Sequence, residues 1–127
     1  MSITINAAFD SGNIRVVAIQ GNVIDLEIVA DHQSDFYQWF HFRVAGARGR
    51  SLTFRIVNAG GSAYAFGWPG YRTRMSTDRQ AWRMIETRYA DGVLEFDFAA
   101  TTDLAWFAYF APYTMEMHEA LVARTAL

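Results

Sequence analysis

The stretch that decides the fold reads Phe36-Tyr37-Gln38-Trp39-Phe40-His41-Phe42-Arg43-Val44. Successive side chains of a β-strand point to opposite faces of its sheet, so this stretch separates into two sets. One set is mostly apolar and is predicted to face a core: Phe36, Gln38, Phe40, Phe42 and Val44. The other set carries hydrogen-bonding groups and consists of Tyr37, Trp39, His41 and Arg43. Aromatic side chains with a polar end are typical of interfaces. The stretch therefore predicts a strand with a core on one face and a partner on the other.

The same alternation recurs along the chain and predicts further strands. Apolar and polar residues alternate over 14–19, 24–30, 52–56, 87–89 and 93–98, and the run 104–111 is apolar on both faces. Gly, Asn, Asp and Pro separate these runs, and Asp91-Gly92 is a strong hairpin signal. The predicted fold class is all-β, an antiparallel β-sandwich of about eight strands. Good helix formers over 114–124 predict a short C-terminal helix.

Length and composition indicate one domain with an ample core. The chain has 127 residues, of which 52% are hydrophobic and 16% aromatic, and it contains no cysteine. It therefore needs no disulfide, and it cannot form a cysteine-ligated zinc site. All eleven basic residues are arginine, the net charge is −2, and no basic stripe exists, so nucleic acid is not an expected partner. Because no signal peptide opens the chain and no apolar run could span a bilayer, we expect a cytoplasmic protein without a membrane partner.

No set of residues in the sequence predicts a catalytic or metal-binding site. The histidines of the chain are His32, His41 and His118. None of them belongs to a His-x-x-Glu or His-Glu-x-x-His motif. Ser11 and Ser76 lie in predicted turns without the flanking motif of a nucleophile. Glu95 and Asp97 share one strand face, but a solvated face explains them more simply than a catalytic carboxylate pair. We therefore predict no catalytic residue, cofactor or metal within this chain.

Five short segments, taken in order, carry a family resemblance. They are 9–14 (FDSGNI), 37–42 (YQWFHF), 54–58 (FRIVN), 67–69 (GWP) and 106–114 (WFAYFAPYT). Each is an ordinary strand or turn sequence, but their order and spacing together are specific. The sequence resembles the N-terminal domain of cytosolic zinc carboxypeptidases, the group that includes tubulin deglutamylases and bacterial relatives. The resemblance runs from Phe9 to Leu121.

The resemblance implies a β-sandwich that precedes a catalytic carboxypeptidase domain and packs on it. In the family, that second domain binds zinc through a His-x-x-Glu pair and a later His, and a Glu acts as general acid/base. None of these residues is present here. Residues 1–127 are then a single non-catalytic domain that helps to position or gate a catalytic domain of the same polypeptide. The parent activity would be removal of C-terminal residues from peptides or proteins, with zinc bound in the absent domain.

The resemblance also gives a candidate domain interface. It consists of the polar-aromatic strand face and the segment that leads toward the second domain: Tyr37, Trp39, His41, Arg43, Tyr109, Pro112, Tyr113 and Thr114. For Tyr109 and Phe107, however, the core of the sandwich is favoured over the interface. If the catalytic domain is absent, apolar surface becomes exposed at this end, and we expect the isolated domain to associate with itself.

A different function class remains open from the sequence alone. A free-standing sandwich module could bind carbohydrate or peptide through exposed aromatic side chains. The candidate stacking residues are Trp39, Trp68 and Trp82. This alternative predicts a stop codon near Leu127 and a secretion signal, whereas the carboxypeptidase hypothesis predicts a reading frame that continues into a His-x-x-Glu motif.

Overall fold

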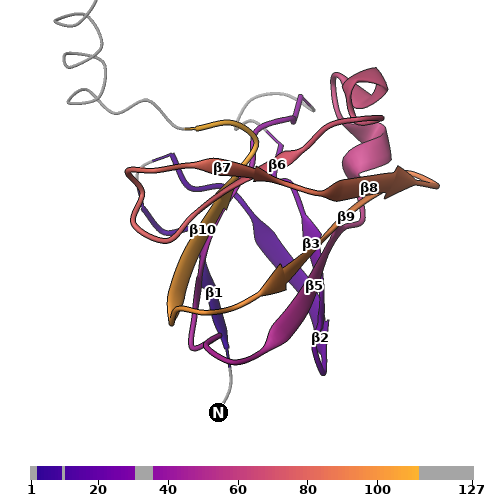
Figure 1. The fold of residues 1–127 in the computed structure, drawn as a ribbon. Coiled ribbons are helices and arrows are strands. Elements are labelled where there is room, and N and C mark those ends of the chain that lie inside the picture. Colours follow the sequence, from indigo (N-terminus) through magenta and orange to yellow (C-terminus); the bar gives the residue numbers. More distant parts are fainter. Residues whose placement is uncertain (1–2, 10, 31–35, 112–127) are drawn as a thin grey trace, which may run out of the picture.

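The computed structural model describes residues 3–9, 11–30 and 36–111, which form two facing β-sheets (Figure 1). Sheet A has the strand order β1 (Thr4–Asn6), β4 (His41–Ala45), β10 (Leu104–Ala108), β6 (Thr73–Ser76) and β7 (Arg83–Ile85). Sheet B has the order β2 (Arg15–Gln20), β3 (Val23–Glu27), β5 (Ser51–Ile56), β9 (Val93–Ala99) and β8 (Thr87–Ala90). Two short 3-10 helices, η1 (Ala59–Gly61) and η2 (Ala65–Gly67), lie between β5 and β6.

The predicted all-β sandwich is confirmed, with two differences in detail. The described residues contain ten strands rather than about eight, because β1 and β7 have three residues each and are too short to show alternation. All strand pairs are antiparallel except β3 and β5, which pair in parallel. The predicted C-terminal helix lies outside the described residues.

The core lies between the sheets and comes from the inward faces that alternation predicted. On β5 and β9, the register pairs Leu52 with Phe98, Phe54 with Phe96, and Ile56 with Leu94, and all six are buried. Phe107 of sheet A is fully buried against them, with its ring centroid 5.1 Å from that of Phe54 and 5.4 Å from that of Phe96. Phe107 is therefore a core residue.

The stretch that decided the fold is mostly as predicted. Phe40, Phe42 and Val44 are fully buried, and Gln38 is nearly so. Phe36, however, is 48% exposed, and this corrects its placement on the core face. The strand β4 begins only at His41, so the chain before it is not held in a sheet and its alternation does not extend to Phe36.

The backbone conformation of the turn between β8 and β9 can be tested by substitution. Asp91 and Gly92 have φ angles of 54° and 78°, as a two-residue turn of the mirror-image type requires. We expect Gly92→Ala to lower the free energy of unfolding by about 1–2 kcal/mol, because a Cβ is strained at positive φ. The atoms nearest to a Cβ at Gly92 would be the Gly60 Cα, at 3.6 Å, and the Gly60 nitrogen, at 3.9 Å, which are ordinary contacts, so the effect is conformational. Urea unfolding measures it, and Asp91→Asn, which tolerates positive φ, should be nearly neutral. Equal stability of Gly92→Ala and the parent would contradict this turn geometry.

Candidate functional site

Segment 36–40 connects the loops at one end of the sandwich. The Tyr37 carbonyl accepts a hydrogen bond from the Ala63 amide at 2.9 Å, and the Tyr37 hydroxyl donates to the Asn58 carbonyl at 2.8 Å. Burial, and then the negative charge of Glu27, raise the pKa of the Tyr37 phenol, so the hydroxyl remains a donor. The segment is thus bonded to the loop that contains η1 and η2.

Gln38 joins the same loop to the end of β10. Its side chain is only 6% exposed, and its Oε1 accepts from the Tyr64 amide at 2.8 Å. Its Nε2 donates to the Tyr64 carbonyl at 3.5 Å and to the Tyr109 hydroxyl at 3.3 Å. The Tyr109 amide in turn donates to the Phe40 carbonyl at 3.0 Å. Three segments that are distant in sequence therefore meet at one buried amide.

A buried aromatic cluster holds the end of β10 in place. The Tyr71 hydroxyl donates to the Tyr109 carbonyl, and burial raises the pKa of Tyr71 far above its usual range. Trp68 packs with its ring centroid 5.4 Å from that of Tyr109 and 5.0 Å from that of Tyr71. Its Nε1 donates to the Ala59 carbonyl at 3.0 Å and to the Ser62 hydroxyl at 2.8 Å. The side chain is 1% exposed, so Trp68 cannot stack on a sugar, and its proposed role in the alternative hypothesis is wrong.

His41 lies on the predicted partner face but is fully buried within its own chain. Its ring packs at centroid distances of 4.8, 5.9 and 5.9 Å against those of Phe9, Trp39 and Trp82. Its Nδ1 lies 3.1 Å from the Ser11 Oγ. Burial, and then the positive charge of Arg79, lower the pKa of His41 to about 4. The imidazole is therefore neutral at physiological pH, and a partner would meet the surrounding rings rather than His41 itself.

The remaining predicted interface residues are partly accessible. Trp39 is half-buried, and its Nε1 donates to the Ser11 carbonyl at 2.7 Å. Arg43 and Tyr109 are also half-buried. Three buried nitrogens in this region have no hydrogen-bond partner: His41 Nε2, Arg43 Nε and Trp82 Nε1. Pro112, Tyr113 and Thr114 lie outside the described residues.

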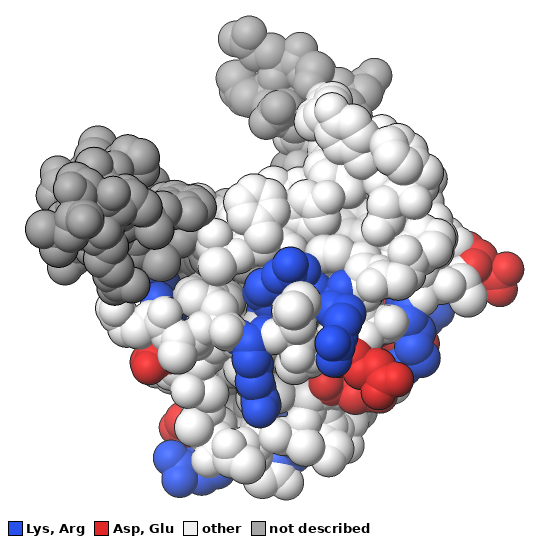
Figure 2. Space-filling model, turned by 45° about the horizontal axis from the view of Figure 1, so that its top comes forward, with Lys and Arg blue, Asp and Glu red and all other residues white. Residues whose placement is uncertain are grey.

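Aromatic rings that are at least partly exposed lie on the segments near Gln38. We call them the aromatic rim, which consists of Phe36, Trp39, Tyr64, Phe66 and Phe110. Phe66 is 82% exposed, and Phe36, Tyr64 and Phe110 are each about half exposed. A pocket of about 330 Å³ opens beside the rim, between segment 36–39 and residues 11–13 and 29–30. The surface over η1 and η2, at the upper right in Figure 2, carries no charged side chain.

Sequence reasoning missed two features of the rim. Phe66 lies between the turn signals Gly60-Gly61 and Gly67, where no alternation indicates which side chains are buried. Gln38 was assigned to the core face, which is correct, but nothing in the sequence indicated its three hydrogen-bond contacts.

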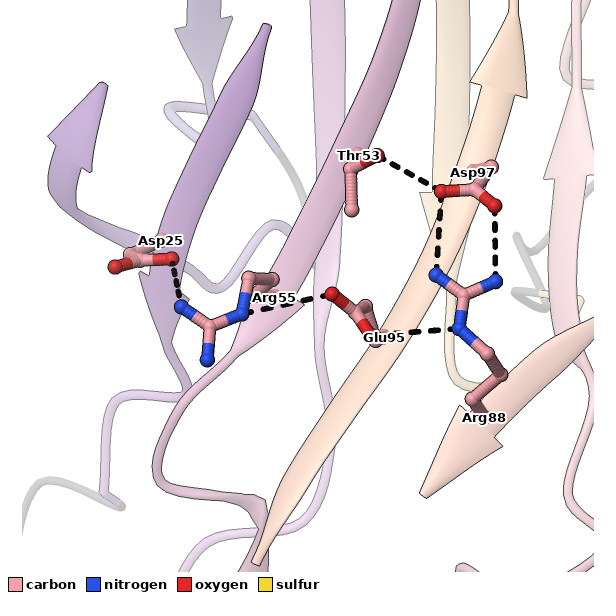
Figure 3. Close-up of polar contacts among 6 residues, drawn as sticks. All are labelled: Asp25, Thr53, Arg55, Arg88, Glu95 and Asp97. Carbon is pink, nitrogen blue, oxygen red and sulfur yellow. Dashed lines mark hydrogen bonds and ion pairs between the residues drawn. The ribbon is translucent and has the colours of Figure 1, made fainter. Parts of the chain in front are cut away.

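The outer face of sheet B is a network of ion pairs across four strands (Figure 3). Arg55 lies between two carboxylates, with Nη1 3.0 Å from Asp25 and Nε 3.6 Å from Glu95. Arg88 also contacts two carboxylates, with Nε 3.3 Å from Glu95 and Nη1 2.8 Å from Asp97. These groups are partly exposed, so each pair contributes modestly to stability.

This network favours the interpretation of Glu95 and Asp97 as residues of a solvated strand face. Both carboxylates are bound by arginine, and hydrogen bonds from Arg88 and then Thr53 lower the pKa of Asp97. A general acid needs a raised pKa rather than a lowered one. The two residues therefore lie on a paired, solvated strand face.

The described part of the chain contains neither a cluster of metal ligands nor a helix that could span a membrane. Among the described residues, no group of three or more His, Cys, Asp or Glu side chains could hold a metal ion. Within the same ranges, no helix has the length and apolar character that crossing a membrane requires.

Comparison with known proteins gives consistent matches. Residues 5–110 match the family described as the cytosolic carboxypeptidase N-terminal domain. An uncharacterized protein of Zymomonas mobilis is 54% identical over 99% of this chain and 33% of its own length. Human cytosolic carboxypeptidase 1 is 30% identical over 89% of this chain and 12% of its own length.

A solved structure gives the same result for the fold. The metallo-carboxypeptidase from Pseudomonas aeruginosa in complex with (2-guanidinoethylmercapto)succinic acid is 41% identical, with a TM-score of 0.87. The match covers 95% of this chain and 33% of that one. The chain therefore spans a third or less of the length of these relatives.

Proposed function

This chain belongs to the family of cytosolic carboxypeptidase N-terminal domains, and we propose that it is the non-catalytic N-terminal domain of a cytoplasmic zinc metallocarboxypeptidase. A catalytic domain of the same polypeptide would remove C-terminal residues from peptides or proteins. The main observation behind this proposal is how much of each chain is included in the structural match. Nearly the whole chain matches a metallo-carboxypeptidase structure, of which it spans only a third.

The proposed role of the domain is to pack on the catalytic domain and to position or gate it. Tyr109 directly follows β10, and its carbonyl, amide and hydroxyl are all held by hydrogen bonds. A chain that leaves the sandwich from so fixed a point would give the following domain a defined starting position. The interface proposed from the sequence includes Pro112, Tyr113 and Thr114, which follow this segment in the sequence and lie outside the described residues.

Zinc, in this proposal, belongs to the catalytic domain. The described residues of this chain offer no convergent ligand group, and the histidine they include, His41, is buried among aromatic rings. The carbohydrate-binding alternative loses Trp68, and its remaining candidates, Trp39 and Trp82, are half-buried. Self-association of the isolated domain stays a prediction.

The coding sequence downstream of Leu127 tests the proposed function. We expect the reading frame to continue and to encode a His-x-x-Glu motif followed by a later His. The complete polypeptide should then bind zinc and release C-terminal residues from peptides, whereas residues 1–127 alone should do neither. A stop codon at Leu127, or a continuation without these ligands, would show that the proposal is wrong.

A further inference from the structure

Three rings of the aromatic rim form a group on two separate loops. Phe36 precedes β4, and Tyr64 and Phe66 flank the first residue of η2. The Phe36 and Tyr64 ring centroids are 5.9 Å apart in an edge-to-face contact, and Tyr64 and Phe66 repeat that geometry at 5.9 Å. Phe66 is the most exposed large apolar side chain among the described residues. Adjacent exposed rings of this kind mark interaction sites in soluble proteins.

Hydrogen bonds hold the backbone that carries these rings. Both backbone polar groups of Tyr64 bind the Gln38 side chain, and the Tyr64 carbonyl also accepts from the Gly67 amide at 2.9 Å. Ala63 is bound to Tyr37, the residue that follows Phe36. The group is therefore preorganised, which reduces the entropy lost when a partner binds.

Gln38 also connects this group of rings to Tyr109, the residue that follows β10. Its Nε2 contacts the Tyr109 hydroxyl, while Tyr71 holds the Tyr109 carbonyl. The three rings and the last described residues therefore share one buried support.

We propose that Phe36, Tyr64 and Phe66 form the docking surface for the catalytic domain that follows this chain, and that Gln38 is the positioning residue of that surface. The proposal rests on the proposed function. The length of the relatives, two-thirds of which lies outside the match, favours this occupant over a second copy. The absence of charged side chains over η1 and η2 indicates an apolar patch on the partner.

Thiol labelling of the complete polypeptide tests the surface. Residues 1–127 contain no cysteine, so a Phe66→Cys variant adds one reporter whose modification peptide mass spectrometry can locate. We expect maleimide to modify it about tenfold or more slowly in the complete polypeptide than in residues 1–127 alone, because docking covers the site. A Val17→Cys variant is the matched control, since Val17 is 51% exposed on the opposite sheet and should react equally in both.

The outcomes separate this inference from the proposed function. Equal labelling of the Phe66→Cys variant in a complete polypeptide that still hydrolyses peptides would overturn the docking surface and leave the proposed function intact. Protection in residues 1–127 alone that grows with concentration would identify a second copy as the occupant and would also overturn the inference. A gene that ends at Leu127 would instead remove the proposed function.

The role of Gln38 has its own test in the same protein. Gln38→Met keeps the size of the side chain but removes its hydrogen bonds, and we expect it to raise the labelling rate of the Phe66→Cys variant by about tenfold. Thr87→Val is the matched control, because it removes part-buried side-chain hydrogen bonds to Thr73 that involve neither Gln38 nor a residue of the aromatic rim. A merely destabilising change would affect both variants alike. Unchanged protection in Gln38→Met, or equal loss of protection in Thr87→Val, would overturn the positioning role.

Discussion

Replacement of Trp68 by alanine is expected to lower the free energy of unfolding by about 3–5 kcal/mol. The side chain is 1% exposed, packs against Phe40, Tyr71 and Tyr109, and donates one indole hydrogen to two acceptors. Alanine would leave a cavity and would remove the indole donor from the Ser62 hydroxyl and from the Ala59 carbonyl, which keeps its hydrogen bond from the Ser62 amide. Because Trp68 supports Tyr109, the exit of the chain should loosen as well.

Urea unfolding, monitored by the far-UV circular dichroism of the backbone rather than by tryptophan fluorescence, measures this effect. Trp68→Phe serves as the control, since it keeps an aromatic ring but loses the hydrogen bonds, and it should be less destabilising than alanine by about 1–2 kcal/mol or more. A Trp68→Ala protein that is as stable as the parent, but has lost affinity for an oligosaccharide, would restore the carbohydrate-binding hypothesis.

Trp68 also shows where prediction from sequence reaches its limit. The strands β5 and β9 were predictable because alternation is a local property, and their registers bury the expected residues. The turn at Asp91-Gly92 was predictable because two adjacent positive φ angles require such residues. Trp68, in contrast, lies in a turn sequence between Gly67 and Pro69, and a turn sequence carries no signal of burial. Its environment comes from segments brought together only by the complete fold.

The candidate site, too, could be predicted from the sequence only in part. Tyr37 and Trp39 were predicted at an interface and are both half-buried, whereas His41, on the same strand face, is fully buried. The rings that cover it, Phe9 and Trp82, are more than thirty residues away in the chain, so no local pattern could indicate them. Phe36 is exposed for the opposite reason, since β4 begins too late to hold it in the sheet.

Acidification from about pH 7 to about pH 5 is expected to lower the free energy of unfolding by about 2 kcal/mol through His41 alone. The pKa of His41 is about 4 in the folded chain, against an ordinary value of 6.5. The unfolded chain therefore binds the proton first, and protonation favours unfolding. The stability contributed by neutral His41 is fully present above pH 6.5 and is lost as the pH falls toward 4.

A His41→Gln variant isolates this effect from the other histidines. Its side chain does not titrate, so its stability should change by about 2 kcal/mol less than that of the parent between these two pH values. Asp78 and Asp97, whose pKa values are lowered from 3.8, lose their contributions only in more acid solution, so they do not obscure this window. Titration of the His41 ring by nuclear magnetic resonance gives the direct measurement. A ring that titrates near 6.5, together with equal pH slopes for parent and variant, would mean that His41 is solvated and that the aromatic cover of Phe9, Trp39 and Trp82 does not form. The domain would then present an open imidazole at its predicted partner face, as the alternation of the strand alone suggests.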